Sequence, residues 1–262
     1  MDVLRRTIER AGGGEDLVLV TVVGVGGSVP PRVGFRMLVA AGDTEGTVGG
    51  GALELEAIRL ARALLASDGG ARLEHLDVSE LDMACGGEVS LFLEPFRAAP
   101  ALWIFGGGHV AKALVPMAAA TGWRVTVVDN RPEFADLARF PGAAATISAP
   151  YDEAAPKVPA GAFAVIVTHG HAHDEMLLEA MARIKPKLPY IGMIGSSRKI
   201  AEALSRIREA GVATGSNIQA PIGLDLGGDS PGEIALCIAA QLQGLRHGKP
   251  GLPHYRDRRA AR

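Results

Sequence analysis

The chain has 262 residues, a formal net charge of −2 and an aromatic content of 5%. The balanced charge gives no bulk attraction to nucleic acid or to an anionic membrane, and few aromatic rings are present to stack on bases. Two cysteines cannot form a disulfide framework and favour a reducing cytoplasm, and the apolar run at 17–25 is too short to span a bilayer.

The N-terminal part begins with a short amphipathic helix expected over residues 1–11 and a buried strand over 17–23. The segment GGSVPPRVGFRML at 26–38 follows, and its prolines and glycines predict a rigid loop. Arg32 in this loop offers a guanidinium suited to an anion. An ordinary loop with a solvated arginine fits the same composition equally well.

A second glycine-rich turn precedes a helix. After a short strand at 37–40, the glycines at 49–51 lead into a helical pattern over 52–66. Glu54 falls in the first turn of that helix, where the helix dipole favours an acid, so simple helix support explains it. A strand is expected over 72–78.

Cys85 is the candidate reactive residue of this half. It is followed by Gly86 and Gly87, which predict a turn before a strand at 89–92. A thiol at such a turn would be accessible, and nearby backbone N–H groups favour its thiolate. The alternative is a buried and inert cysteine. Cys237 lies in a helical apolar pattern and is predicted to belong to the core.

Prolines between 94 and 100 mark a domain boundary, which predicts a smaller N-terminal α/β domain at 1–98 and a Rossmann-like domain at 99–246. The basic residues, glycines and prolines at 247–262 predict a flexible tail. Strands and helices alternate after the boundary, which predicts a doubly wound parallel sheet. The expected strands are 102–105, 124–129, 144–148, 163–168 and 190–194, and the expected helices are 109–120, 173–184, 197–210 and 232–245.

The turn after the first of these strands carries a dinucleotide-binding pattern. Three glycines from Gly106 to Gly108 separate the strand from a helix beginning at His109, and the next strand ends on Asp129. Gly106 permits a sharp turn, and Gly108 lets the backbone approach a pyrophosphate at the helix N-terminus. Asp129 is placed to accept a ribose hydroxyl.

The turn THGHAHD falls at the same carboxyl edge of the sheet. Its histidines, His169, His171 and His173, suggest a metal site, although residues two apart in a loop do not define one geometry. His169 and His171 are also candidates for acid–base chemistry. Asp174 is predicted to be an N-cap.

The turn IGSSRK at 194–199 also reaches this edge. Ser196 opens a helix there, and the two cations that follow, Arg198 and Lys199, are candidates to hold a phosphate. A solvated helix start accounts for these two residues just as well.

These blocks together resemble the XdhC family, whose members are accessory proteins that bind the molybdenum cofactor and help insert it into xanthine dehydrogenase. The matching segments are GSVPPRVGFRML, VGGGALE, CGGEVSLFLE, IFGGGHVAKAL, VVDNRPEFA, THGHAHD, YIGMIGSSRK and PIGLDLGGDSPGEIA. The chain departs from the family at Gly107, where alanine is commoner, at Gly170, where a larger or acidic residue is expected, and at His173, which is additional.

The resemblance implies a non-enzymatic maturation chaperone. It would bind and protect the molybdenum cofactor (molybdopterin) and deliver it to apo-xanthine dehydrogenase, acting with a cysteine desulfurase that sulfurates the cofactor. Cys85 would contact the cofactor and its molybdenum, and a homo-oligomer is expected. The residues assigned to the cofactor are Cys85, Gly86, Gly87, Gly106, Gly108, His109, Asp129, Arg32, Ser196 and Arg198.

Two other functions fit the residues. An NAD(P)-dependent oxidoreductase would use the same glycine turn, with Asp129 on the ribose and His109 among the acid–base candidates, while Arg131 leaves NAD and NADP undistinguished. No Tyr–Lys pair or other hydride-transfer constellation accompanies the turn. The third interpretation is a regulatory nucleotide-sensing module.

Overall fold

The computed structural model describes residues 3–67, 69–81 and 86–249. The chain divides into two compact units, Met1–Ala98 and Ala99–Arg262. Each unit carries its own sheet and its own hydrophobic core.

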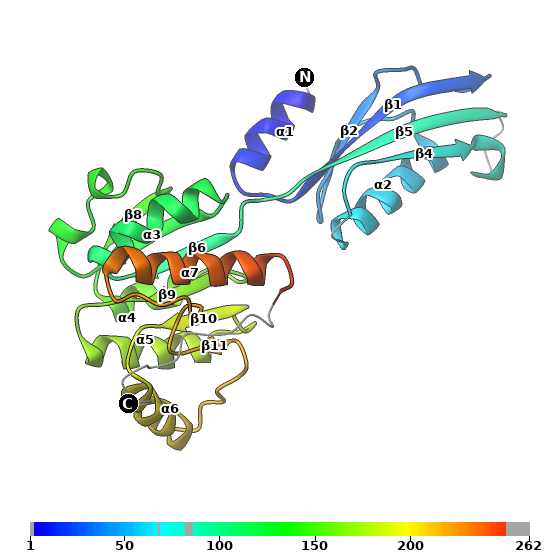
Figure 1. Cartoon of the computed structure of the whole chain (residues 1–262). Helices are drawn as coiled ribbons and strands as arrows, with labels where there is room; N and C mark the ends of the chain where they lie inside the picture. The colour runs from blue at the N-terminus through cyan, green and yellow to red at the C-terminus, as the bar shows by residue number, and fades with distance from the viewer. Residues whose placement is uncertain (1–2, 68, 82–85, 250–262) are drawn as a thin grey trace. The chain divides into compact units, whose positions relative to one another are not determined.

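The first unit is a five-stranded antiparallel sheet with strand order β3-β2-β1-β5-β4 (Figure 1). The strands are β1 (Leu17–Gly27), β2 (Arg36–Val39), β3 (Thr44–Gly46), β4 (Arg72–Asp77) and β5 (Gly87–Phe96). Helix α2 (Gly51–Leu65) packs on one face, because alternate residues such as Val18 and Val20 meet its apolar side at Leu53. Helix α1 (Val3–Gly12) covers a smaller apolar cluster around Leu17 and Leu38.

The second unit is a six-stranded parallel sheet with strand order β11-β10-β9-β6-β7-β8. The strands are β6 (Ala101–Phe105), β7 (Arg124–Asp129), β8 (Ala145–Ser148), β9 (Phe163–Ile166), β10 (Tyr190–Met193) and β11 (Ile218–Gln219). Chain order reverses between β6 and β9, which pair directly. Such a reversal opens a crevice at the carboxyl ends of the strands, where ligands bind in doubly wound folds.

Helices cover both faces of this sheet. Leu102 and Ile104 of β6 face a cluster with α3 (His109–Ala120) and α7 (Pro231–Arg246). Trp103 and Phe105 face the opposite cluster, formed with α4 (Tyr151–Ala154), α5 (His171–Arg183) and α6 (Ser197–Glu209). The described 3-10 helices are Val78–Leu81, Pro132–Phe134, Leu137–Arg139 and Ala155–Lys157.

The fold class predicted from the sequence is confirmed, with differences at particular elements. Strand β1 runs on to Gly27 because it pairs with the start of β5, so Gly87 lies in a strand and not in the predicted turn. The sequence did not predict β3, β11 or α4, which have three, two and four residues. Within the described part of the chain, no helix combines the length and the apolar character that crossing a bilayer requires.

Candidate functional site

Three glycine-containing segments meet at one place in the first unit. Ser28 N donates to Gly86 O at 3.3 Å, which joins the proline loop to the beginning of β5. A Cβ on Gly49 would lie 3.0 Å from the Pro31 ring, so the turn before α2 also contacts this loop. We call these segments, 26–31, 49–51 and 86–87, the N-terminal glycine cluster.

The predicted site residues in and near this cluster differ in their exposure to solvent. Gly86 is exposed beside the proline loop, and Arg32 is also exposed. Gly87 packs against Gly26, because a Cβ there would lie 2.3 Å from Gly26 O. Cys85 lies outside the described residues, so its part in cofactor binding stays a prediction.

A carboxylate of α2 itself, that of Glu54, accepts hydrogen bonds at the start of the helix. Glu54 accepts a hydrogen bond from Thr47 Oγ1 at 2.6 Å and one from Gly50 N at 3.2 Å. The acid lies in the first turn, where the positive end of the helix dipole favours it. The structure thus supports the helix-supporting role expected for Glu54.

The glycine turn of the second unit uses each of its glycines differently. Gly106 has φ +109°, and a Cβ there would lie 2.4 Å from Val167 O. A Cβ on Gly107 would lie 2.1 Å from Phe134 O. The alanine that is commoner at this position in the family would therefore collide with the Phe134 carbonyl in this chain. A Cβ on Gly108 would have no heavy atom within 4 Å among the described neighbours, so this position is open.

Asp129 does not present a free carboxylate to a ribose, contrary to the sequence-based expectation. It is 0% exposed and accepts hydrogen bonds from Gly107 N at 2.7 Å and from Arg131 N and Nε, each at 2.9 Å. Burial opposes ionisation of this carboxyl, but the hydrogen bonds from Arg131 and Gly107 outweigh it and hold the pKa of Asp129 below its usual range. Its observed role is to fasten the turn.

Arg131 is the cation that this arrangement brings to the turn. Its Nε and Nη2 form a bidentate pair with Asp129, and its guanidinium lies 3.7 Å from the centre of the Phe134 ring. The side chain is 30% exposed, so the group is fixed and still reachable. An arginine held in this way can offer its remaining N–H groups to an anion. The sequence signal that could have revealed this role is the position of Arg131 two residues after Asp129. In the sequence analysis, Arg131 bears only on the choice between NAD and NADP.

The histidine turn is built differently from the prediction. Helix α5 starts at His171, so its N-cap is Gly170 and the N-cap expected at Asp174 is wrong. Asp174 lies in the first turn, 4% exposed, and accepts bonds from Thr168 Oγ1 at 2.6 Å and Thr168 N at 3.2 Å. Burial raises the pKa of Asp174, and the bonds from Thr168 partly offset this.

The imidazole of His173 lies against an aromatic side chain that the sequence analysis missed. The His173 ring is 5.3 Å from the Tyr151 ring and 5.3 Å from the His169 ring. Tyr151 is 2% exposed, and burial together with the nearby charge of Asp129 raises its pKa. Within the described ranges, no three His, Cys, Asp or Glu side chains are arranged to hold a metal ion.

The two cations of the third predicted turn, Arg198 and Lys199, are placed differently. Ser196 is the N-cap of α6, and Arg198 is 84% exposed and 4.0 Å from Glu202. Lys199 instead reaches the histidine turn, with Nζ 2.6 Å from His171 Nε2. His109 opens α3 and is exposed.

Comparison with known proteins gives one family match in each of the two units. The sequence profile of the XdhC Rossmann domain matches residues 102–242, and that of the XdhC and CoxI family matches residues 11–77. The chain belongs to the XdhC family. The two profiles fall on the second and the first unit respectively.

Similar proteins include YqeB of Escherichia coli K12, described as uncharacterised, which is 29% identical over 84% of this chain and 42% of its own length. A Bacillus subtilis 168 protein described as a probable xanthine dehydrogenase subunit is 31% identical over 58% of this chain and 45% of its own. This XdhC-family chain thus spans less than half of these relatives. A crystal structure described as a xanthine dehydrogenase from Bacillus halodurans shares the fold, with TM-score 0.54 and 21% identity over 95% of this chain and 97% of that one.

Proposed function

We propose that this XdhC-family chain binds the molybdenum cofactor as cargo, protects it and delivers it to apo-xanthine dehydrogenase. Family membership across both units carries the proposal. The similarity to the Bacillus subtilis protein, whose description names xanthine dehydrogenase, supports this choice of acceptor. A cysteine desulfurase would sulfurate the cofactor before transfer, and a cytoplasmic location and a homo-oligomer stay predictions.

The cofactor phosphate fits the start of α3. That helix has no acid in its first turn and no side-chain cap, so its N–H groups and its dipole face an anion without an internal competitor. The position of Gly108 is open, and Arg131 is fixed beside the turn by Asp129. We therefore assign the phosphate to the backbone at Gly108 and His109 and to the guanidinium of Arg131.

The metal end of the cargo suits a thiolate. Molybdenum is a centre that soft sulfur ligands contact, and Cys85 directly precedes Gly86 of the N-terminal glycine cluster. The exposed Arg32 belongs to the loop that Ser28 joins to Gly86. We propose that Cys85 takes part in cofactor binding in the first unit, and this contact is tested separately from the phosphate contact in the second unit.

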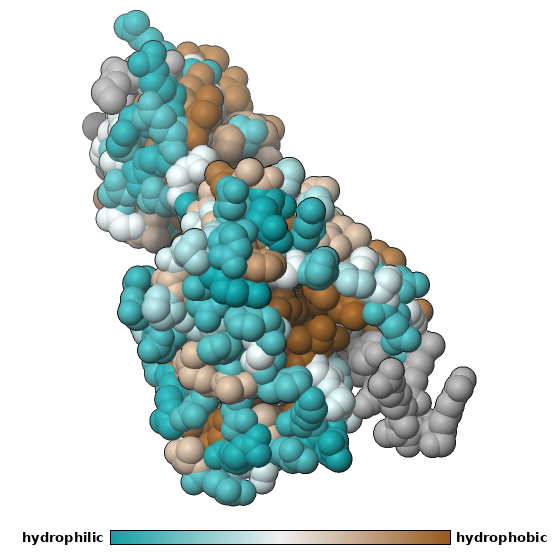
Figure 2. Space-filling view, turned by 90° about the vertical axis from the view of Figure 1, so that its left-hand side faces the viewer, coloured by the Kyte–Doolittle hydropathy of each residue, from teal (hydrophilic) through white to brown (hydrophobic). Residues whose placement is uncertain are grey.

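Delivery also needs a face for the acceptor. Val23, Val25 and Val33 of the first unit are 44%, 43% and 60% exposed. Figure 2 shows hydrophobic areas among the hydrophilic surface of this unit. Exposed apolar side chains in the unit that carries Arg32 give a weak and reversible contact, which a carrier that must release its acceptor requires. We propose this part of the first unit as the exchange face.

The rival oxidoreductase function loses its main support. It rested on Asp129 accepting a ribose hydroxyl, but that carboxylate is fully buried and is already bound to Gly107 and Arg131. A dinucleotide could use Asp129 only after these bonds had broken. The proposed function therefore predicts no steady turnover of NAD(P)H with small carbonyl or hydroxyl substrates.

The deciding experiment is anaerobic transfer. Apo-xanthine dehydrogenase mixed with cofactor-loaded protein should gain more activity than with the same concentration of free cofactor. Equal activation would contradict delivery.

Calorimetric titration of the cofactor into Cys85→Ala, with Cys237→Ala as the matched control, tests the thiol. Cys237 is 3% exposed in α7, so its change should lower stability without lowering affinity. Equal affinity of Cys85→Ala and the wild type would remove the thiol from the proposal.

A further inference from the structure

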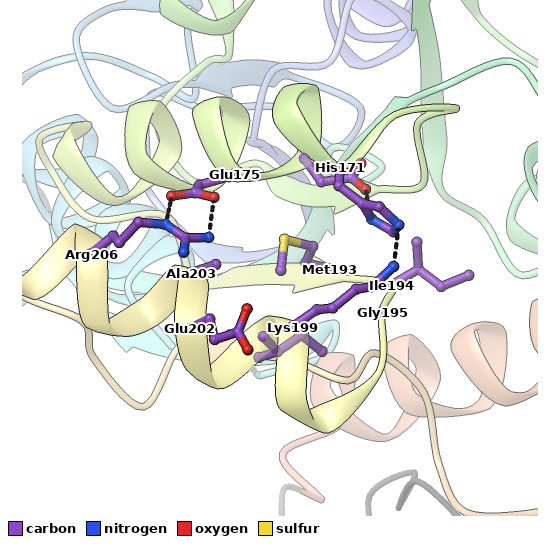
Figure 3. Close-up of a pocket in the computed structure, with 11 residues that line it drawn as sticks. His171, Glu175, Met193, Ile194, Gly195, Lys199, Glu202, Ala203 and Arg206 are labelled. Carbon is purple, nitrogen blue, oxygen red and sulfur yellow. Dashed lines mark hydrogen bonds and ion pairs between the residues drawn. The ribbon is translucent and has the colours of Figure 1, made fainter. Parts of the chain in front are cut away.

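A groove in the second unit lies between α5 and α6, above the end of β10 (Figure 3). Its volume is about 230 Å³, and Met193, Ile200 and Ala203 provide apolar surface within it. None of the residues of the glycine turn lines it. Pockets for drug-sized ligands are usually larger, roughly 300–1,000 Å³, so this groove fits one ring or a short chain.

The two ends of the groove differ in charge. At one end Arg206 Nε and Nη2 bind both oxygens of Glu175, at 2.6 and 2.7 Å, so that these charges neutralise each other. At the other end Lys199 Nζ lies 2.6 Å from His171 Nε2 (Figure 3). Among the described residues, no carboxylate lies within ion-pair distance of Lys199, although Glu202 also lines the groove. The Lys199 end is therefore the positive one.

The backbone adds to this polarity. Helices α5 and α6 begin at His171 and Ser197, so both positive helix ends lie near Lys199, and α6 has no acid in its first turn. Asp174 also lines the groove, but its Oδ1 accepts both bonds from Thr168, and its Oδ2 is 3.9 Å from His171 Nδ1. This acid is committed to the histidine turn, behind the imidazole, and does not pair with Lys199.

We propose that this groove binds a small organic carboxylate, with its anionic end at the Lys199 ammonium and its apolar body on Met193 and Ala203. The ammonium keeps further N–H groups after its bond to His171, and a carboxylate can accept them as charge-assisted hydrogen bonds. The apolar floor selects an organic acid over inorganic phosphate. This site is separate from the cofactor site at the glycine turn and goes beyond the proposed function.

The test uses the full chain and benzoate as the probe. Calorimetry should show saturable binding of benzoate, and benzyl alcohol and benzylammonium should each bind at least tenfold more weakly, since they lack the anion. Lys199→Met should weaken benzoate binding at least tenfold. The matched control is Lys157→Met, at an exposed lysine outside the groove, and it should leave the affinity unchanged. Equal binding of benzoate and benzyl alcohol, or an unchanged affinity of Lys199→Met, would overturn the proposal.

A second measurement locates the ligand. With methionine methyl groups labelled, benzoate should shift the NMR resonance of Met193 through the ring current, whereas that of Met117, in α3 on the opposite face of the sheet, should not move. Benzoate binding that leaves Met193 unshifted would place the acid elsewhere and contradict the groove. Arg131→Gln should retain benzoate binding, which separates failure at this site from failure at the cofactor site.

Discussion

Helices α2 and α3 both begin at a run of three glycines, yet their first turns are chemically opposite. The N-caps are Gly50 and Gly108, and the fourth helical residue is Glu54 in α2 but Lys112 in α3. Glu54 accepts the Gly50 N–H and so closes its own helix start. Helix α3 has no acid in its first turn to do the same.

Helix α5 follows the pattern of α2, since its N-cap is Gly170 and its fourth residue is the buried Asp174. The comparison teaches that glycines before a helix are a backbone requirement, and that the residue one turn later decides whether the helix start is closed by the protein or left for an anion. By this criterion α3 and α6 begin with starts left open for an anion, and of these two α3 follows the three-glycine turn.

The largest predicted effect separates backbone need from ligand need within the α3 turn. Gly106→Ala should lower the free energy of unfolding by roughly 3 kcal/mol or more, because it combines an unfavourable φ with a clash against Val167 O. Gly108→Ala meets open space at an ordinary φ of −76° and should change stability by less than about 1 kcal/mol while weakening cofactor binding. Urea denaturation measures both. Equal losses of stability would remove the distinction between the two glycines.

The second prediction tests the brace that holds the α3 turn. Arg131→Gln should cost about 2–3 kcal/mol at neutral pH, since it leaves the buried Asp129 without its guanidinium. The comparable change Arg139→Gln should cost less, because Arg139 stacks on Phe134 at 4.8 Å and has no partner carboxylate among the described ion pairs.

The pH dependence of this brace follows from the lowered pKa of Asp129. Its stabilising contribution is complete above the unfolded value, about 4, and is lost as the pH falls through the lower folded value. In Arg131→Gln the effect of burial prevails and raises the pKa of Asp129 in the folded state, so the stability of the variant relative to the wild type should recover as the pH falls. Denaturation curves between pH 3 and 7 that fall in parallel would contradict this account.

A smaller effect is expected at the closed start of α5. Burial raises the pKa of Asp174, so its ionised form opposes folding, and stability is lost as the pH rises through the folded value. Asp174→Asn should therefore stabilise the protein at pH 7 by an amount on the order of 1 kcal/mol, with the Asn oxygen still accepting from Thr168. The gain should disappear below about pH 4. A loss of stability at pH 7 would show that the charge itself is needed.

The sequence allowed the elements of the fold to be predicted better than the contacts of the site. Periodic apolar runs such as that of β6 revealed the parallel sheet, because a buried strand must be apolar on both faces. The two residues of β11 carry no such pattern. The burial of Asp129 depends on its hydrogen bonds from Arg131, and the requirement for glycine at 107 depends on the position of Phe134 O. Only the folded chain brings these groups together. Position 85, which carries the predicted thiol, lies outside the described residues.

The smallest predicted effect exchanges the residues that distinguish α2 from α3. Lys112 is exposed at the position in α3 that Glu54 holds in α2, so Lys112→Glu supplies the missing first-turn acid without disturbing the core. It should raise the stability of the ligand-free protein by a few tenths of a kcal/mol, up to about 1, through the helix dipole. The new carboxylate competes for the same N–H groups, so cofactor affinity should fall.

The reverse change, Glu54→Lys, should lower stability by a similar amount, because it removes the acceptor of Thr47 Oγ1 and Gly50 N, and should leave cofactor affinity unchanged. Thermal melting and calorimetric titration of the two variants separate the effects. If Lys112→Glu kept full affinity for the cofactor, the phosphate would not lie at the start of α3.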